Sequence, residues 1–335
     1  MGMKRILIVA TGGTIASLKN EGGLKPELDV DDLIRLSGIR SDECIVEGVL
    51  VMNIDSTNMT PGRWFEIAEA IYKRYDDYDG FVVTHGTDTM AYTSAALKYI
   101  FKHLNKPIIV TGSQYPITEE YTDAIQNFTD AVRFAMEELA GVFIVFDGNL
   151  IAGTRAIKVK TRSYDAFESV NFPNVATIKH HKISYNPLVS DQFRRKRDRA
   201  ACRMRTKYND RILVLKLIPG MYPDIFDYIR ENYKGVIIES FGIGGIPNDD
   251  RNLSRKIVEL VEAGIAVVLT TQCLEEGVEF GIYEVGNQIP TDKVIYAGDF
   301  NTEALVAKTM IGMGSYDTIE ALKAYIETPS TYKHE

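Results

Sequence analysis

Short runs of apolar residues recur along the chain, and most are followed by a segment in which apolar residues return every three or four positions. The runs are rich in valine and isoleucine and do not alternate with polar residues, which is typical of strands buried on both faces of a parallel sheet. Because strand and helix patterns alternate, the sequence predicts a doubly wound α/β fold. The expected strands are 6–10, 81–84, 108–111, 142–146, 212–217, 236–239 and 265–271.

The clearest helix start is Thr60 followed by Pro61, because a capping hydroxyl before a proline at the first helical position is a frequent beginning of a helix. Its apolar spacing is expected to bury Phe65, Ala68, Ile71, Tyr72 and Tyr75 on one face. Further helices are expected near 90–103, 122–139, 222–232, 253–263, 302–313 and 317–327.

The 335 residues are enough for two domains at about 150 residues each. A basic segment without hydrophobic periodicity, residues 194–211, contains nine Lys or Arg and two Asp, and it separates two series of strands and helices. A nucleic-acid patch is the alternative interpretation, but aromatic residues are not interleaved for stacking. We expect a larger N-terminal domain with a mainly parallel sheet over 1–190, a basic linker over 191–211 and a smaller C-terminal α/β domain over 212–335.

Composition narrows the class of protein. The net charge is −8, and it is −15 outside the basic segment, which argues against a nucleic-acid partner. Three widely spaced cysteines, Cys44, Cys202 and Cys273, predict neither a disulfide framework nor a zinc site and fit a reducing cytoplasm. Since no apolar run approaches the ~18–20 residues of a membrane span and no signal peptide is evident, we expect a cytoplasmic protein with no membrane partner.

Three expected strands end in similar turns. In an open parallel sheet ligands bind at the carboxyl ends of the strands, and glycine lets the backbone approach a ligand closely. One such turn is more often a plain connection, but two copies of Thr-x-Gly-Thr, the second bearing a carboxylate, favour a site. The turns are Thr11-Gly12-Gly13-Thr14, Thr84-His85-Gly86-Thr87-Asp88-Thr89 and Thr111-Gly112-Ser113-Gln114.

Other catalytic patterns are missing from the sequence, including a P-loop, a G-x-G-x-x-G turn after the first strand, a G-x-S-x-G elbow and an H-E-x-x-H pair. A threonine hydroxyl is a weak nucleophile until a neighbouring group takes its proton. A lysine held in place by an aspartate can do so. Lys158 is the first candidate, Lys160 fits the pattern equally well, and a surface position is the plain alternative for either.

Together the turns closely resemble the two signature motifs of L-asparaginases, at 10–16 and 84–90. The resemblance continues through 53–59, 158–167 and 270–273, covers essentially the whole chain, and is strongest to the cytoplasmic, type I branch. It implies hydrolysis of L-asparagine to L-aspartate and ammonia through an acyl-enzyme, without a metal or an organic cofactor. It also implies a homodimer or a homotetramer built as a dimer of dimers.

The resemblance assigns roles to individual positions. Thr14 matches the nucleophilic threonine, and Thr87, Asp88 and Lys158 match a second catalytic group in which the lysine, oriented by the aspartate, activates the threonine or a water. The substrate-binding positions that match are Asp55, Ser56, Thr87 and Asp88.

One departure concerns the activation of Thr14. Leu24 occupies the position of a loop tyrosine that is proposed to activate the nucleophile in many members. Tyr283 is similar to a tyrosine that reaches the site from a neighbouring subunit in some type I enzymes, and packing at an interface is its alternative role. We expect the glycine-containing segment around Leu24 to act as a flexible lid.

Two other functions fit the same motifs. The first is the asparaginase-like subunit of a tRNA-dependent amidotransferase, for whose additional N-terminal domain we expect no room before Thr11. The second is an amino-acid sensor without catalytic activity. The sequence leaves open the preference for asparagine over glutamine and the presence of allosteric regulation.

Overall fold

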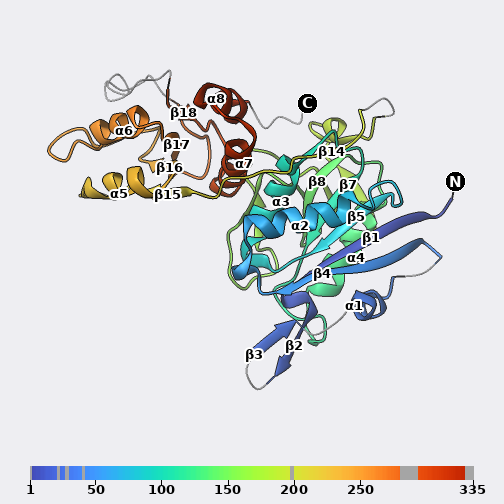
Figure 1. Cartoon of the computed structure of the whole chain (residues 1–335). Coiled ribbons are helices and arrows are strands. Elements are labelled where there is room, and N and C mark those ends of the chain that lie inside the picture. Colours follow the sequence, from blue (N-terminus) through green and yellow to red (C-terminus); the bar gives the residue numbers. More distant parts are fainter. Residues whose placement is uncertain are drawn as a thin grey trace. The chain divides into compact units, whose positions relative to one another are not determined.

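The computed structural model describes residues 2–20, 23–26, 30–39, 42–196, 200–279 and 293–328. Contacts divide the chain into two compact units, of which the first extends to Thr206 and the second begins at Lys207 (Figure 1). This division falls inside the segment expected as a basic linker. The prediction of a two-domain α/β protein is confirmed.

An eight-stranded sheet forms the centre of the first unit, in the order β13-β12-β9-β8-β7-β5-β1-β4. The neighbouring strands β8, β7, β5, β1 and β4 are parallel to one another. Strands β9, β12 and β13 extend the sheet through antiparallel pairs. The sheet is therefore mainly parallel, as expected. Its strands are β1 (Lys4–Gly12), β4 (Cys44–Ile54), β5 (Gly80–Thr84), β7 (Pro107–Thr111), β8 (Gly141–Phe146), β9 (Asn149–Ala152), β12 (Ala176–Lys179) and β13 (Lys182–Tyr185).

Helices cover both faces of this sheet because both faces of the strands are apolar. Ile6, Ile8 and Ala10 of β1 pack in one core cluster with Leu33 of α1 and Phe128 of α4. Alternate side chains of a strand point to opposite faces, so Leu7 and Val9, also buried, face the other side, where α2 and α3 lie (Figure 1). The helices are α1 (Val30–Ser37), α2 (Pro61–Tyr72), α3 (Met90–Ile100) and α4 (Ala124–Ala135).

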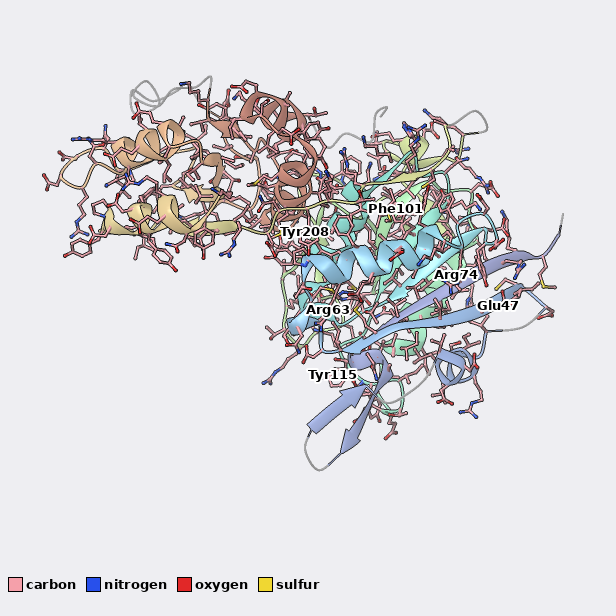
Figure 2. All side chains as sticks on the ribbon, in the orientation of Figure 1. Glu47, Arg63, Arg74, Phe101, Tyr115 and Tyr208 are labelled. Carbon is pink, nitrogen blue, oxygen red and sulfur yellow. The ribbon has the colours of Figure 1, made fainter. Side chains whose placement is uncertain are left out.

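Helix α2 starts at Pro61 as predicted, but its buried face differs from the prediction. Trp64, Ile67, Ala68 and Ile71 are buried, whereas Tyr72 is 43% exposed. The indole N–H of Trp64 donates to Thr93 Oγ1 at 3.1 Å, so this ring can be buried with its polar group satisfied. The Thr60 side chain makes no capping hydrogen bond. Figure 2 draws the side chains on α2, among them Arg63, which is labelled.

Short elements complete the first unit. Within the segment expected as a flexible lid, β2 (Ser17–Asn20) pairs antiparallel with β3 (Gly23–Pro26). Two further pairs are β10 (Ala156–Lys158) with β11 (Phe167–Ser169), and β6 (Phe101–Lys102) with β14 (Arg203–Met204). The 3-10 helices are η1 (Thr14–Ala16), η2 (Ser56–Asn58), η3 (Thr87–Thr89) and η4 (Ser190–Phe193).

The second unit has a parallel sheet in the order β15-β16-β17-β18. Its central strands are fully buried over most of their length, which explains their unbroken apolar sequence. The elements are β15 (Ile212–Lys216), β16 (Gly235–Ser240), β17 (Ala266–Thr271), β18 (Ile295–Tyr296), α5 (Asp224–Asn232), α6 (Leu253–Glu262), α7 (Thr302–Ser315) and α8 (Ile319–Glu327).

Candidate active site

The three similar turns meet at the carboxyl edge of the large sheet. Ala10 of β1 pairs with Thr84 of β5, and Thr84 pairs with Thr111 of β7, so the three strands end at the same level. Strand β4 ends beside them, because Gly12 pairs with Ile54. The pairing brings the residues after four strands to one place.

Glycines make the close approach of these turns possible. A Cβ on Gly13 would lie 2.7 Å from the Gly86 Cα, and one on Gly86 would lie 2.6 Å from the Ser56 Oγ. A Cβ on Gly112 would overlap the His85 carbonyl. Since a side chain has no room at these positions, the backbones pack directly on one another and bring Thr14, Ser56 and Thr87 into one neighbourhood.

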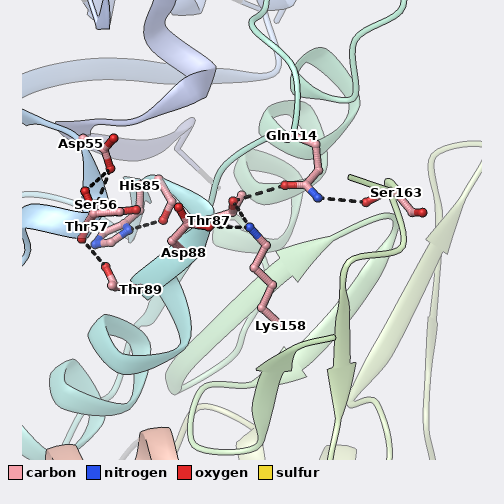
Figure 3. A network of polar contacts seen from close by, with 11 residues as sticks. Asp55, Ser56, Thr57, His85, Thr87, Asp88, Thr89, Gln114, Lys158 and Ser163 are labelled. Carbon is pink, nitrogen blue, oxygen red and sulfur yellow. Dashed lines mark hydrogen bonds and ion pairs between the residues drawn. The ribbon is translucent and has the colours of Figure 1, made fainter. Parts of the chain in front are cut away.

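Lys158 lies between the two side chains that the sequence grouped with it. Its Nζ donates to Thr87 Oγ1 and to Asp88 Oδ1, both at 2.7 Å (Figure 3). Pairing of β10 with β11 places Lys158 opposite Phe167, so the lysine extends from a hairpin. Its side chain is 18% exposed, and the Asp88 carboxylate is 57% exposed.

The structure distinguishes Lys158 from Lys160. The Lys160 ammonium bonds to Asp165, and this hydrogen bond raises the pKa of Lys160 and lowers the pKa of Asp165. Both groups are largely exposed, as expected for a surface ion pair. Of the two lysines, therefore, Lys158 contacts the second threonine turn.

Thr14 begins the short helix η1 directly after Gly13, and its side chain is half-buried. Tyr283 and the side chain of Leu24 lie outside the described residues, so the activation of Thr14 stays a prediction. The Gly13 N–H donates to the Ile54 carbonyl at 3.1 Å and is therefore not available to stabilise an oxyanion.

Asp55 and Ser56 follow β4 and begin η2. Asp55 Oδ1 accepts hydrogen bonds from the backbone N–H of Thr57 at 2.8 Å and from its hydroxyl at 2.9 Å, which leaves an exposed carboxylate in a fixed orientation. Ser56 is buried against Gly86, and its carbonyl accepts from Thr89 Oγ1 at 2.8 Å. These contacts connect η2 to the second threonine turn (Figure 3).

His85 is a buried structural residue in this turn. Burial lowers its pKa to about 4, so the ring is neutral at neutral pH. The ring nitrogen Nδ1 lies 2.7 Å from the Gly86 carbonyl, which can only accept, so Nδ1 carries the proton. Nε2 consequently accepts from Thr93 Oγ1 at 2.8 Å, and Thr93 accepts from Trp64.

Two family models match the chain, "Asparaginase, N-terminal" over residues 5–189 and "Glutaminase/Asparaginase C-terminal domain" over residues 211–326. The chain belongs to the asparaginase family. It is therefore an enzyme of the amidohydrolase class.

Individual relatives of the asparaginase family cover nearly the whole chain. An L-asparaginase of Thermococcus kodakarensis is 36% identical, over 96% of this chain and 97% of its own length. The solved structure of the thermostable L-asparaginase from Thermococcus kodakarensis matches with a TM-score of 0.90 and 35% identity, over 98% of each chain. One subunit of a glutamyl-tRNA(Gln) amidotransferase, from Methanosphaera stadtmanae, is 31% identical, over 97% of this chain and 75% of its own length.

Gln114 contacts a residue of this asparaginase-family site although the sequence assigned it no role. Its Oε1 accepts from Thr87 Oγ1 at 3.2 Å, and its Nε2 donates to the Ser163 carbonyl at 3.2 Å (Figure 3). The only signal in the sequence was its place in the third strand-end turn. The direction of a side chain cannot be read from that pattern.

No group of three or more His, Cys, Asp or Glu residues in the described ranges is arranged to hold a metal ion. Among the helices that the structure describes, none has the length and apolarity needed to cross a membrane. All three cysteines are free.

Proposed function

We propose that this asparaginase-family chain hydrolyses L-asparagine to L-aspartate and ammonia. The observation that carries the proposal is the contact of one lysine with both Thr87 and Asp88, beside a turn that holds a second threonine. Relatives named as L-asparaginases, which align over almost the whole chain, support it.

The proposed reaction has two steps. Thr14 Oγ attacks the carbon of the substrate's side-chain amide, the C–N bond breaks, and the nitrogen leaves as ammonia with the proton that the hydroxyl gave up. Water then attacks the threonine ester, which releases aspartate and restores the hydroxyl. Lys158, oriented by Asp88, is the proposed partner of Thr87 in activating the threonine or the water.

The substrate is a zwitterion, and the proposed binding groups match its charges. The exposed carboxylates of Asp55 and Asp88 attract the α-ammonium group. The Ser56 hydroxyl and the local N–H groups, that of Thr87 among them, are the proposed donors to the α-carboxylate. No metal or organic cofactor takes part in this scheme.

A component of a tRNA-dependent amidotransferase is the second candidate, and the 31% identity to such a protein supports it. The higher identity to the L-asparaginase, 36% against 31%, favours the asparaginase. An amino-acid sensor is the third. We also propose a cytoplasmic location, supported by the free cysteines, and a homodimer or homotetramer that binds neither nucleic acid nor membrane.

Ammonia release by the purified protein tests the function, with asparagine and glutamine assayed in parallel and with EDTA present in a matched sample. We expect release from asparagine that EDTA leaves unchanged, and a loss of most of kcat in Thr14→Ala and Thr87→Ala with the fold intact.

Absence of release from either amide would favour the sensor, and co-purification with a partner protein and tRNA would favour the amidotransferase. Near wild-type turnover in either variant would contradict the role of that threonine. Light scattering measures the oligomeric state.

A further inference from the structure

The Gln114 side chain bridges the second threonine turn and the loop that follows Lys158. One end accepts from the Thr87 hydroxyl, and the other donates to the Ser163 carbonyl. A carbonyl can only accept, so it fixes the amide with Nε2 toward Ser163 and Oε1 toward Thr87. The amide therefore offers Thr87 an acceptor.

The backbone under Gln114 is held as firmly as its side chain. The Gln114 N–H donates to both carboxylate oxygens of Asp123, at 2.9 and 3.1 Å, and the Tyr115 N–H donates to Asp123 Oδ1 at 3.0 Å. Asp123 is buried, and its burial raises the pKa of the carboxyl. Asn127 completes the set by donating to Asp123 and to the Gly112 carbonyl. The turn is thus anchored before the side chain reaches Thr87.

The position of one proton gives Gln114 a function. Lys158 donates to Thr87 Oγ1, and an ammonium group has no lone pair with which to accept in return. The proton of the Thr87 hydroxyl must therefore point to another acceptor. Gln114 Oε1 is that acceptor in the structure.

We propose that Gln114 is a positioning residue that accepts from the Thr87 hydroxyl and so holds Oγ1 in one orientation beside Lys158 Nζ while the lysine is protonated. The role rests on the proposed function, which makes Thr87 and Lys158 partners in the reaction. Without the acceptor the hydroxyl rotates among several orientations, and fewer molecules have the reactive arrangement.

Two substitutions distinguish the effect of the hydrogen-bond acceptor from the effect of side-chain size. Gln114→Met keeps the length and removes both polar groups, whereas Gln114→Glu keeps an acceptor for Thr87 and loses the donor to Ser163. We expect Gln114→Met to lower kcat about tenfold with KM changed less than about twofold, the size of one lost hydrogen bond. The kcat of Gln114→Glu should lie between that of Gln114→Met and that of the wild type.

Tyr164→Phe is the matched control. Its hydroxyl donates to the Tyr121 carbonyl at 2.7 Å, and its ring packs edge-on against Tyr115, which Figure 2 labels, so it joins the loop that follows Lys158 to the loop that carries Gln114. We expect wild-type kcat in this variant. Thermal unfolding checks each fold, and Gln114→Glu remains the test if Gln114→Met does not fold.

The outcomes are distinct. An active wild type whose kcat is unchanged in Gln114→Met, or equally reduced in Gln114→Met and Gln114→Glu, would overturn the role of Gln114 alone. An equal fall in Tyr164→Phe would show that loop attachment is the cause. A wild type without amidase activity would overturn the proposed function and this role with it.

Discussion

Gly13 packs directly against Gly86, so closely that a Cβ on Gly13 would lie 2.7 Å from the Gly86 Cα. This one contact joins the two threonine turns, which are separated by more than 70 residues in the sequence. Gly13 also has φ 84° and ψ 176°, a conformation that is open almost only to glycine. The relative position of Thr14 and Thr87 therefore depends on the absence of two side chains.

Gly13→Ala tests this dependence. The methyl group adds a backbone strain and a steric clash, so the free energy of unfolding should fall by about 1–3 kcal/mol and amidase activity should be lost. Gly38→Ala is the control, because Gly38 also has positive φ (71°) but nothing within 4 Å of the added carbon. It should cost about 1 kcal/mol and leave activity unchanged. Urea unfolding and kcat are the measurements, and an active Gly13→Ala would contradict the dependence.

Lys158→Met should lower kcat by about 100-fold or more, because it removes the group that contacts both Thr87 and Asp88. Lys160→Met, two residues further on, removes only an exposed ion pair with Asp165 and should retain wild-type kcat. Steady-state kinetics of the two variants, with circular dichroism to check the fold, decide between the lysines. Equal losses would mean that the hairpin as a whole, rather than the Lys158 ammonium, is what the reaction needs.

The sequence predicts most of the parallel strands of the two units because their residues are largely buried, as Ile6 to Ala10 illustrate. It misses β4, an edge strand in which exposed residues such as Glu47 interrupt the apolar pattern. It also misplaces the buried face of α2, since the hydrogen bond to Thr93 that lets Trp64 be buried lies 29 residues away in the sequence. The spacing of apolar residues predicts which side chains are buried, but it does not identify hydrogen-bond partners that are distant in the sequence.

Local sequence patterns are equally unable to identify all side-chain partners in the candidate active site. The strand-end turns and their glycines predict that Thr14, Thr87 and Asp88 gather at one edge, and the sheet register explains why. Spacing could not separate Lys158 from Lys160, because the choice depends on which way a hairpin residue points. Gln114 was unassigned for the same reason.

Stability should depend on pH through His85. Burial lowers its pKa from 6.5 to about 4, so the unfolded chain binds a proton in this interval and the folded chain does not. The contribution of His85 to the free energy of unfolding should therefore be complete above pH 6.5. It should fall by about 3 kcal/mol as the pH decreases to about 4. His85→Gln can keep both hydrogen bonds but does not titrate, so this part of the slope should disappear. Urea unfolding at several pH values measures it, and identical slopes would contradict the assignment.

Tyr283→Phe tests the activation of Thr14. If the phenolic hydroxyl takes part in proton transfer, kcat should fall at least about tenfold while the oligomer persists. Light scattering monitors the assembly beside the kinetics. Unchanged kcat would return Tyr283 to a packing role.

The chain contains a single tryptophan, and that residue is Trp64. Its indole N–H bonds to Thr93, which bonds to His85 next to Gly86 and Thr87, so the chromophore is two hydrogen bonds away from the second threonine turn. Intrinsic fluorescence excited at the red edge of the absorption band consequently comes from one position beside the candidate site. The protein carries its own optical reporter, with which rearrangement of the turn during ligand binding can be followed without a label.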